Sequence, residues 1–598
     1  MLFSLSFFLT LLTGVLGYID GHGTAYFDSM DFFVRVYGIS AVITFLVGLS
    51  FWLLGEKKNP EDLELLEREG FAVVGLAWLL VAAFGAAPYL LAGELDPLDA
   101  YFESMSGFTT TGATMIGADE QFTITINDTL LQDQENIVYH DSTFLNTSFT
   151  NISLIDTYFD HCTFENVSFR DVELEDCWFI NCTFLNSSYE NRTIHLSTRA
   201  PSVFFRDAQF SDGNDGDEDS WKEVYYPWPK SLLFWRSFTQ WLGGMGIVVL
   251  TIVILSRFMG SSIQLLKVEL PGLTMARLKP KIAQTAAIFW KIYALFTLVE
   301  ILLLWRFTNL AGHEFIPGGM PLYDAFGNSF TCLSSGGFSP RALNIEAYDN
   351  VVFEAILITF MAIAGTNFVL HFHALHGNWR KLVEDEEFRT FISIMLLASL
   401  IITVKLAVSD MYSPFLAFRY ALFQVVSLNT ATGYSSIGYG TWPESTRFLL
   451  VILMVIGGSA GSTSGGMKVI RLIVLMKIAR REISRTIHPQ REMPITVGGR
   501  TLPENLVQAV STYFFVYLAI LVIASTIIMF TGENLMDSVS SVATAMGGVG
   551  PPAGVEGPYF SFSAMHPLSK VVLILCMWLG RIEILAGFIL FAPWSYKE

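Results

Sequence analysis

The chain has 598 residues, of which 52% are hydrophobic and only 15% are charged. This composition excludes a soluble globular domain and indicates a protein that crosses a membrane several times. The net charge of −19 argues against a nucleic-acid partner. Most of that charge comes from one segment, 119–223, which holds about twenty acids and five bases.

Ten apolar runs are each long enough to span about 30 Å of hydrocarbon at roughly 20 residues per helix. They lie near 2–17, 32–54, 71–92, 232–255, 282–305, 351–372, 390–409, 448–475, 506–530 and 571–592. The first run lacks the basic start and the cleavage site of a signal peptide, so we expect a helix there. Basic residues gather in alternate connections, which places these connections and both termini in the cytoplasm. We therefore expect a multi-pass protein of the cell membrane, in contact with lipid.

A polar segment that ends in a glycine-containing turn recurs four times between the apolar runs. The copies are Asp99–Gly112, Asp324–Gly337, Tyr420–Gly433 and Asp537–Gly550, and in each the first residue precedes the last glycine by thirteen positions. One copy has Tyr420 where the others have Asp. Four unrelated loops would not share this spacing, so the pattern predicts a pore with fourfold pseudo-symmetry.

The composition of these turns favours a cation filter. Irregular backbone is tolerated at membrane depth only where protein buries it or water lines it. Glycine allows a turn to aim carbonyl oxygens inward, and four such turns around one axis would replace the water shell of a cation. The predicted filter residues are Thr110, Thr111 and Gly112; Ser335, Gly336 and Gly337; Ala431, Thr432 and Gly433; and Gly548, Val549 and Gly550.

A run of small residues interrupts the apolar run near 448–475. It consists of Gly457, Gly458, Ser459, Ala460, Gly461, Ser462, Thr463, Ser464, Gly465 and Gly466. Such residues weaken a helix, by up to about 1 kcal/mol per glycine, but they also let helices pack closely. Arg581 lies in the middle of the last apolar run, where an unpaired charge is costly. It must face water, a carboxylate or the carbonyls of a loop.

The insert 117–226 has a period of its own. Large apolar residues recur every five residues at Phe144, Phe149, Leu154, Phe159, Phe164, Phe169, Leu174, Phe179 and Phe184. This period fits neither a helix nor a simple strand. It resembles the pentapeptide-repeat family, which implies a small four-sided β-solenoid with four pentapeptides per coil. A similar module occurs in the luminal domain of synaptic vesicle glycoproteins. Cys162 and Cys182 would then lie one coil apart, in an insert that is extracellular or periplasmic.

Two features of the insert leave alternatives open. Seven Asn-x-Ser/Thr sequons are either glycosylation sites or simply residues favoured at the corners of the repeat. They begin at Asn127, Asn146, Asn151, Asn166, Asn181, Asn186 and Asn191. The acidic run Asp212–Asp219 is either a calcium site or a solvated linker, and its spacing does not match an EF-hand.

The four turns, Gly457–Arg471 and Leu579–Glu583 together closely resemble the Trk/Ktr/HKT cation transporters, and best the Trk-type potassium uptake membrane subunit. Further similar segments are Glu269–Gly272, Lys279–Ile282, Trp290–Tyr293 and Asn367–His371. The resemblance covers nearly everything except 117–226. It implies an all-α polytopic membrane protein, built of four helix–pore-loop–helix units around a central pore.

The chain divides accordingly into six parts. They are a two-helix prelude at 1–60, a first pore unit at 61–116 and 227–278, the insert at 117–226, and further pore units at 279–384, 385–500 and 501–598.

The resemblance also implies a role for each candidate residue. Glycine at all four of Gly112, Gly337, Gly433 and Gly550 is the potassium-associated pattern, whereas serine in the first would suggest sodium. Potassium would be held at Thr111, Gly112, Gly336, Gly337, Thr432, Gly433, Val549 and Gly550. The run 457–466 would be an intramembrane gate contacted by Arg581. The fourth turn departs from the family in lacking an Asn pair before its Gly-Pro.

No catalytic constellation and no phosphate-binding loop occurs in the sequence, so we do not expect an enzyme or an organic cofactor. The resemblance implies a homodimer and a cytoplasmic nucleotide-binding ring subunit as partners. The expected function is uptake of potassium ions. Two alternatives are a less selective Na⁺/K⁺ pathway, and a surface-binding protein in which the insert is the functional part.

Overall fold

The computed structural model describes residues 34–54, 67–116, 230–258, 282–307 and 320–584, with short gaps in the last range, and a set of strands between 134 and 195. The gaps are 342–343, 349, 410, 489–492, 555–556 and 583. The helix expected near 2–17 lies outside the described residues. The chain separates into two compact units, the second being Ala118–Trp228 with Glu314–Pro317, and each is described here by itself.

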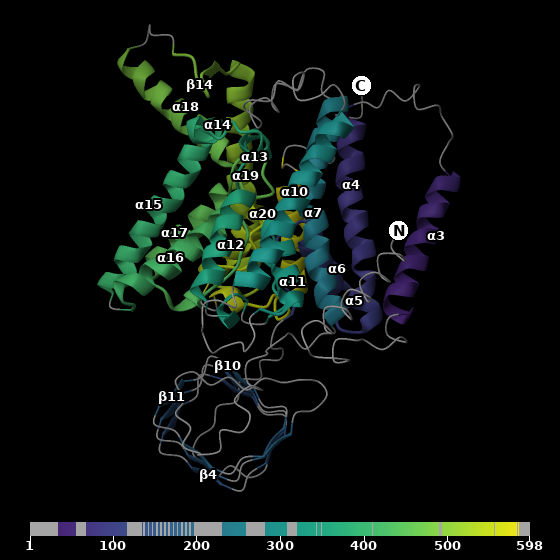
Figure 1. The fold of residues 1–598 in the computed structure, drawn as a ribbon, viewed down its shortest axis with the longest axis vertical. Helices are drawn as coiled ribbons and strands as arrows, with labels where there is room; N and C mark the ends of the chain where they lie inside the picture. The colour runs from purple at the N-terminus through teal and green to yellow at the C-terminus, as the bar shows by residue number, and fades with distance from the viewer. Residues whose placement is uncertain are drawn as a thin grey trace. The chain divides into compact units, whose positions relative to one another are not determined.

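The first unit is helical (Figure 1). Its helices are α3 (Ile39–Leu54), α4 (Glu67–Gly85), α5 (Ala87–Ala92), α6 (Pro97–Phe108), α7 (Lys230–Phe258), α10 (Ile282–Phe307), α11 (Leu322–Leu333), α12 (Val351–Ala364), α13 (Phe368–Leu375), α14 (Arg380–Glu384), α15 (Glu386–Val408), α16 (Pro414–Asn429), α17 (Glu444–Ile456), α18 (Val469–Ile487), α19 (Glu504–Phe530), α20 (Leu535–Gly547) and α21 (Pro567–Arg581). A hairpin of β14 (Thr496–Val497) and β15 (Arg500–Thr501) precedes α19. The expected all-α membrane fold is confirmed for this unit.

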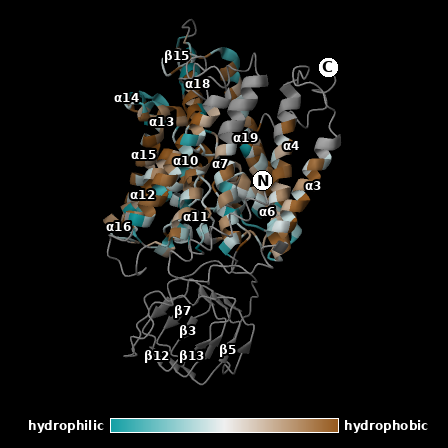
Figure 2. Ribbon diagram, turned by 45° about the vertical axis from the view of Figure 1, so that its right-hand side comes forward, coloured by the Kyte–Doolittle hydropathy of each residue, from teal (hydrophilic) through white to brown (hydrophobic). Residues whose placement is uncertain are grey.

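Apolar side chains cover the outer faces of the long helices, as expected where a helix meets lipid. Phe45, Leu400 and Val522 are more than half exposed, and in Figure 2 the ribbons of α3 and α15 are coloured largely as hydrophobic. In the described residues, four segments are long and apolar enough to span a membrane, or five if the bent pair α12–α13 is one span. They are Gly75–Ala92, Ala286–Arg306, Glu386–Val408 and Glu504–Phe530.

The span expected near 351–372 is not one straight helix. The chain bends by 106° between α12 and α13, at Gly365–Asn367. The Asn367 side chain accepts a hydrogen bond of 2.9 Å from the Val369 N–H and so caps α13 as a new helix. The sequence predicted one span here because the run is apolar and long enough to cross the membrane. Hydropathy does not reveal that Asn367 starts a second helix within it.

Four short helices lie among the long ones. α6, α11, α16 and α20 have 12, 12, 16 and 13 residues. At 1.5 Å per residue they are roughly 18 to 24 Å long, too short to cross the hydrocarbon. Each is followed by one of the four turns predicted from the sequence, so each copy is a helix that enters the unit and stops.

The described part of the second unit consists of short parallel strands. They are β1 (Gln134–Glu135), β2 (Val138–His140), β3 (Thr143–Leu145), β4 (Ser148–Thr150), β5 (Ser153–Ile155), β6 (Tyr158–Asp160), β7 (Thr163–Glu165), β8 (Ser168–Arg170), β9 (Glu173–Glu175), β10 (Trp178–Ile180), β11 (Thr183–Leu185), β12 (Ser188–Glu190) and β13 (Thr193–His195). They form four sheets, in the orders β1-β5-β9-β13, β10-β6-β2, β11-β7-β3 and β12-β8-β4.

The register of these sheets is a constant twenty residues. Phe144 pairs with Phe164, which pairs with Phe184, and every other pair of neighbouring strands has the same offset. This is the offset of a coil made of four five-residue repeats. The strands continue the five-residue spacing beyond the large apolar residues of the sequence pattern, because β2, β12 and β13 centre on Tyr139, Tyr189 and Ile194.

The register predicts where the cysteines of the insert lie. Cys162 and Cys182, themselves outside the described residues, immediately precede the paired residues Thr163 and Thr183. Parallel strands lie about 4.8 Å apart, so a short bifunctional thiol reagent such as dibromobimane should bridge Cys162 and Cys182 in the native chain. Peptide mapping measures the bridge. In a Cys182→Ser variant Cys162 should remain unbridged, and a Cys162–Cys177 product there would contradict the four-sided coil.

Candidate functional site

The four turns after the short helices share one backbone conformation. The residue two places before the last glycine is left-handed in every copy, with φ of 52° at Thr110, 55° at Ser335, 57° at Ala431 and 66° at Gly548. The last glycines are left-handed too, with φ of 83° at Gly112, 75° at Gly337, 82° at Gly433 and 102° at Gly550. For a non-glycine residue this conformation costs about 1 kcal/mol or more, and such strain gathers at functional sites.

One hydrogen bond closes all four turns in the same way. The residue before the last glycine donates its N–H to the carbonyl oxygen five residues earlier. The N–O distances are 2.8 Å from Thr111 to Ser106, 2.8 Å from Gly336 to Thr331, 2.8 Å from Thr432 to Ser427 and 3.0 Å from Val549 to Thr544. The copy that begins with Tyr420 is therefore structurally equivalent to the three that begin with Asp.

The turns form a closed ring in chain order. A β-carbon placed on each last glycine would collide with the carbonyl oxygen just before the last glycine of the next turn. The distances would be 2.1 Å from Gly112 to Gly336 O, 2.0 Å from Gly337 to Thr432 O, 1.7 Å from Gly433 to Val549 O, and 2.8 Å from Gly550 to Thr111 O. All twelve predicted filter residues belong to this ring, and none of the four glycines can be replaced without moving a neighbouring carbonyl.

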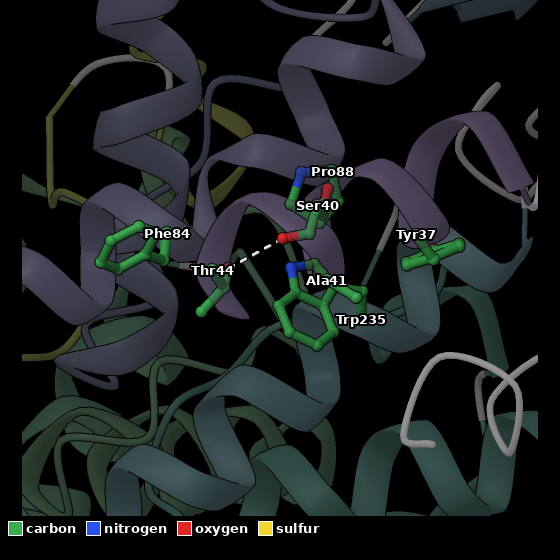
Figure 3. Close-up of a pocket in the computed structure, with 7 residues that line it drawn as sticks. All are labelled: Tyr37, Ser40, Ala41, Thr44, Phe84, Pro88 and Trp235. Carbon is green, nitrogen blue, oxygen red and sulfur yellow. Dashed lines mark hydrogen bonds between the residues drawn. The ribbon is translucent and has the colours of Figure 1, made fainter. Parts of the chain in front are cut away.

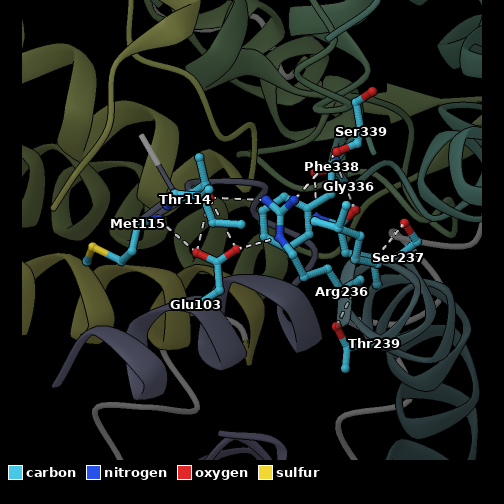
Figure 4. A network of polar contacts seen from close by, with 12 residues as sticks. Glu103, Thr114, Met115, Arg236, Ser237, Thr239, Gly336, Phe338 and Ser339 are labelled. Carbon is cyan, nitrogen blue, oxygen red and sulfur yellow. Dashed lines mark hydrogen bonds and ion pairs between the residues drawn. The ribbon is translucent and has the colours of Figure 1, made fainter. Parts of the chain in front are cut away.

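A buried ion pair supports the first turn (Figure 4). Arg236 of α7 and Glu103 of α6 are almost fully buried, with 2.7 Å between Nε and Oε1. Glu103 Oε2 also accepts a hydrogen bond of 2.8 Å from the Met115 N–H, and Arg236 Nη2 donates to Thr114 Oγ1 at 3.0 Å. The pair therefore fixes the chain where it leaves the first turn. The sequence analysis did not identify either residue.

Gln240, one turn further along α7, supports the second turn. Its Nε2 donates to the Gly336 carbonyl at 2.7 Å, and its Oε1 accepts from the Phe338 N–H at 3.1 Å. Arg236 also lies over the Phe338 ring, 4.0 Å from its centre. The sequence signal for these two residues was a charged and an amide side chain four residues apart in an apolar helix. Both contact residues in or next to the ring of turns.

The acids that begin the repeats bind other parts of the protein. Asp99 pairs with Lys570 of α21 at 2.8 Å, and Asp324 pairs with Arg341 at 2.8 Å. Asp537 accepts a hydrogen bond from the Asn534 amide. These carboxylates lie at the N-termini of the short helices, where negative charge is favourable. Their contacts position the helices.

The run 457–466 forms a loop between α17 and α18 that bonds to the break between α12 and α13. The N–H groups of Ser459 and Thr463 donate to the carbonyls of Gly365 and Ala364, at 2.9 and 3.3 Å. In return the Phe368 N–H donates to the Gly461 carbonyl at 3.1 Å. Two irregular segments thus satisfy each other's backbone, as burial inside a membrane protein requires.

The same loop touches the ring. Thr463 Oγ1 lies 2.9 Å from the hydroxyl of Ser335 in the second turn and donates to the Leu333 carbonyl at 3.0 Å. A β-carbon on Gly465 would lie 2.0 Å from the Gly547 carbonyl oxygen. The loop is therefore packed against the ends of the second and fourth short helices.

Arg581 contacts this loop rather than a carboxylate. Its Nη1 donates to the Thr463 carbonyl at 3.1 Å, and the side chain is buried. Its Nε and Nη2 have no protein partner among the described residues. The sequence left water, a carboxylate or a loop carbonyl as possible partners of Arg581, and in the structure its partner is the loop carbonyl of Thr463.

Two other candidate features carry no chemistry. Cys332 and Cys576 are free and buried, which is typical of cysteines that act as small apolar side chains in a core. A small pocket between α3, α4, α5 and α7 is lined largely by apolar side chains (Figure 3). Its three hydroxyls all donate to protein atoms: Tyr37 to Ser231 Oγ, Ser40 to the Val36 carbonyl and Thr44 to the Ser40 carbonyl.

The sequence matches the TrkH family of cation transport proteins over residues 191–595, and residues 120–213 match the luminal domain of SV2A, SV2B and SV2C. The chain is 30% identical to the Trk system potassium uptake protein TrkH of Salmonella typhimurium, over 97% of this chain and 94% of that protein. The figures are the same for its counterpart in Escherichia coli.

The fold is similar to the crystal structure of the potassium transporter TrkH from Vibrio parahaemolyticus. The TM-score is 0.69 at 27% identity, and the match covers 99% of this chain and 98% of the other. Both likenesses extend over almost the whole chain. This protein therefore belongs to the TrkH family of membrane cation transporters.

Proposed function

We propose that this protein takes up potassium ions, which pass in single file through the ring of four turns. The observation that carries the proposal is the ring itself, in which each last glycine lies against a carbonyl oxygen of the next turn. Carbonyl oxygens held in this way replace the water shell of a dehydrated cation. Relatives that are named potassium uptake proteins support potassium as the ion.

The filter would consist of the residues around these glycines, with potassium held at Thr111, Gly112, Gly336, Gly337, Thr432, Gly433, Val549 and Gly550. The short helices add a further preference for cations, because each turns its partly negative C-terminal end toward the ring. Because glycine has no side chain, only backbone atoms would line the ion pathway at these four positions. A less selective Na⁺/K⁺ pathway is the competing proposal, and the permeability measurement below separates the two.

The loop 457–466 would be the gate, because it packs directly against two of the short helices and is held there by Arg581. The bond from Arg581 to the Thr463 carbonyl holds the loop in place, and the positive charge repels cations. A homodimer and a cytoplasmic nucleotide-binding ring subunit would be the partners that act on this gate.

A second candidate function concerns the insert. Its match to the luminal domain of SV2A, SV2B and SV2C and its separation as a compact unit favour a surface-binding module beside the transport function.

Expression in a host that lacks its own potassium uptake tests the transport proposal, since growth on low potassium should be restored. Gly112→Ser should lower the K⁺ over Na⁺ permeability ratio by about tenfold, which corresponds to about 1.4 kcal/mol. The reason is that a β-carbon there would lie 2.1 Å from the Gly336 carbonyl oxygen. Reversal potentials of the purified protein in bilayers measure the ratio.

Gly246→Ser is the matched control, because a β-carbon on Gly246 of α7 meets nothing within 4 Å. It should keep the original permeability ratio. An unchanged ratio in Gly112→Ser would show that the ring is not the filter.

Arg581→Ala should raise the ion flux several-fold and leave the permeability ratio unchanged, because it removes a positive charge and a bond to the loop but no ring atom. Shortening the loop 457–466 should have the same effect. Tracer flux into liposomes measures both. Arg480→Ala, an exposed arginine of α18, should behave like the original protein. Normal flux in both gate variants would rule out the gate.

Replacing residues 119–223 by a short linker should lower uptake at low ionic strength and leave it nearly normal at high salt. The acids of this segment begin five residues after Thr114 and would raise the local concentration of cations. Salt screens such a field within about 8 Å at physiological strength. Uptake rates at two salt concentrations test this, and an equal loss at both would instead indicate a role in folding or gating.

A further inference from the structure

Glu387, near the start of α15, is a buried acid that the transport mechanism above does not use. Its side chain is almost fully buried. The same oxygen, Oε1, accepts hydrogen bonds from the Ala460 N–H at 2.7 Å and from the Ile470 N–H at 3.2 Å. Ala460 belongs to the loop 457–466, and Ile470 lies in the first turn of α18, directly after it. One carboxylate therefore bonds the loop and the helix that follows it.

The N-terminus of α18 explains why an acid is favourable here. The residue before the helix, Lys468, is left-handed with φ of 76° and makes no side-chain cap. Unpaired N–H groups and the positive end of the helix dipole attract a carboxylate. Glu387 supplies that carboxylate from another helix. Glu387 Oε1 therefore both caps the N-terminus of α18 and bonds the loop.

The neighbouring acid, Glu386, bonds elsewhere. It forms an ion pair with Lys477 of α18 and accepts a hydrogen bond of 3.0 Å from the Gly498 N–H in the β14–β15 turn. Neither contact involves the loop. The same substitution, Glu to Gln, can therefore be made at two consecutive residues, of which only Glu387 contacts the loop.

We propose that Glu387 is a positioning residue that holds the loop in its closed arrangement against the ring. The proposal rests on the proposed function of the loop as the gate. For the loop to leave the ring, the Ala460 N–H has to give up its hydrogen bond to the buried Glu387 carboxyl group, and losing that acceptor is costly for a buried N–H. Glu387 and Arg581 hold the loop from different sides, Glu387 through the Ala460 N–H and Arg581 through the Thr463 carbonyl.

Removing the Glu387 carboxylate should therefore favour the open loop. We expect Glu387→Ala to raise the maximal flux by about tenfold, the change that loss of one such bond represents. The potassium concentration for half-maximal flux and the K⁺ over Na⁺ ratio should stay the same, because no ring atom is altered. Glu387→Gln, which keeps the shape and one acceptor oxygen but loses the charge, should give a smaller rise in the same direction.

The test uses the full chain in liposomes and measures the initial flux of a rubidium tracer over a range of potassium concentrations. Glu386→Gln is the matched control and should leave the flux unchanged. Arg581→Ala is measured beside it as a reference for an opened gate. If Glu387→Ala does not fold, which its melting temperature in detergent reveals, Glu387→Gln carries the test.

Each result is decisive. A raised maximal flux in the Glu387 variants, with normal half-saturation and a normal Glu386→Gln control, supports the proposal. Unchanged or lower flux in a folded Glu387 variant overturns it, and a raised flux in Arg581→Ala then leaves the gate itself intact. If neither Glu387→Gln nor Arg581→Ala raises the flux, the loop is not the gate and both proposals fail.

Discussion

The structure depends on one constraint, which is that backbone N–H and C=O groups at membrane depth find no bulk water and must bond within the protein. Helices meet this constraint by themselves, but a transporter also needs irregular segments where an ion passes. The four turns meet it with the same five-residue hydrogen bond in every copy. The loop 457–466 meets it by bonding to a second irregular segment, the break between α12 and α13. The first solution is local to each turn, whereas the second needs a pair of segments that are distant in the sequence.

The same constraint explains why polar side chains are buried around the ring of turns. Gln240 donates to the Gly336 carbonyl, and the Glu103–Arg236 pair fixes the exit of the first turn. A buried ion pair contributes little net stability by itself, because both charges must be desolvated. The ion pair instead holds the backbone of the first turn in position, and carbonyl oxygens can select an ion only if they are held in position. The polar contacts of α7 act on the ring in this way.

The loop and the ring are in direct contact, which links the two proposed parts of the transport path. The Thr463 hydroxyl contacts Ser335 of the ring, and the Thr463 carbonyl accepts a hydrogen bond from Arg581. Glu387 holds the same loop three residues earlier, at Ala460. A change at either side chain therefore acts on a segment that already lies against the ring.

The sequence by itself was enough for the features that repeat. The thirteen-residue spacing located all four turns, including the copy with Tyr420, and the five-residue period matched strands with a register of twenty residues. Such features are local, because a turn or a coil needs its own residues at set intervals. The tertiary structure alone decided the order of turns around the ring, the 106° bend after α12, and the partners Glu103, Arg236 and Glu387. These depend on contacts between residues far apart in the chain, such as Gly550 and Thr111, and no local pattern encodes which distant groups will satisfy a buried backbone.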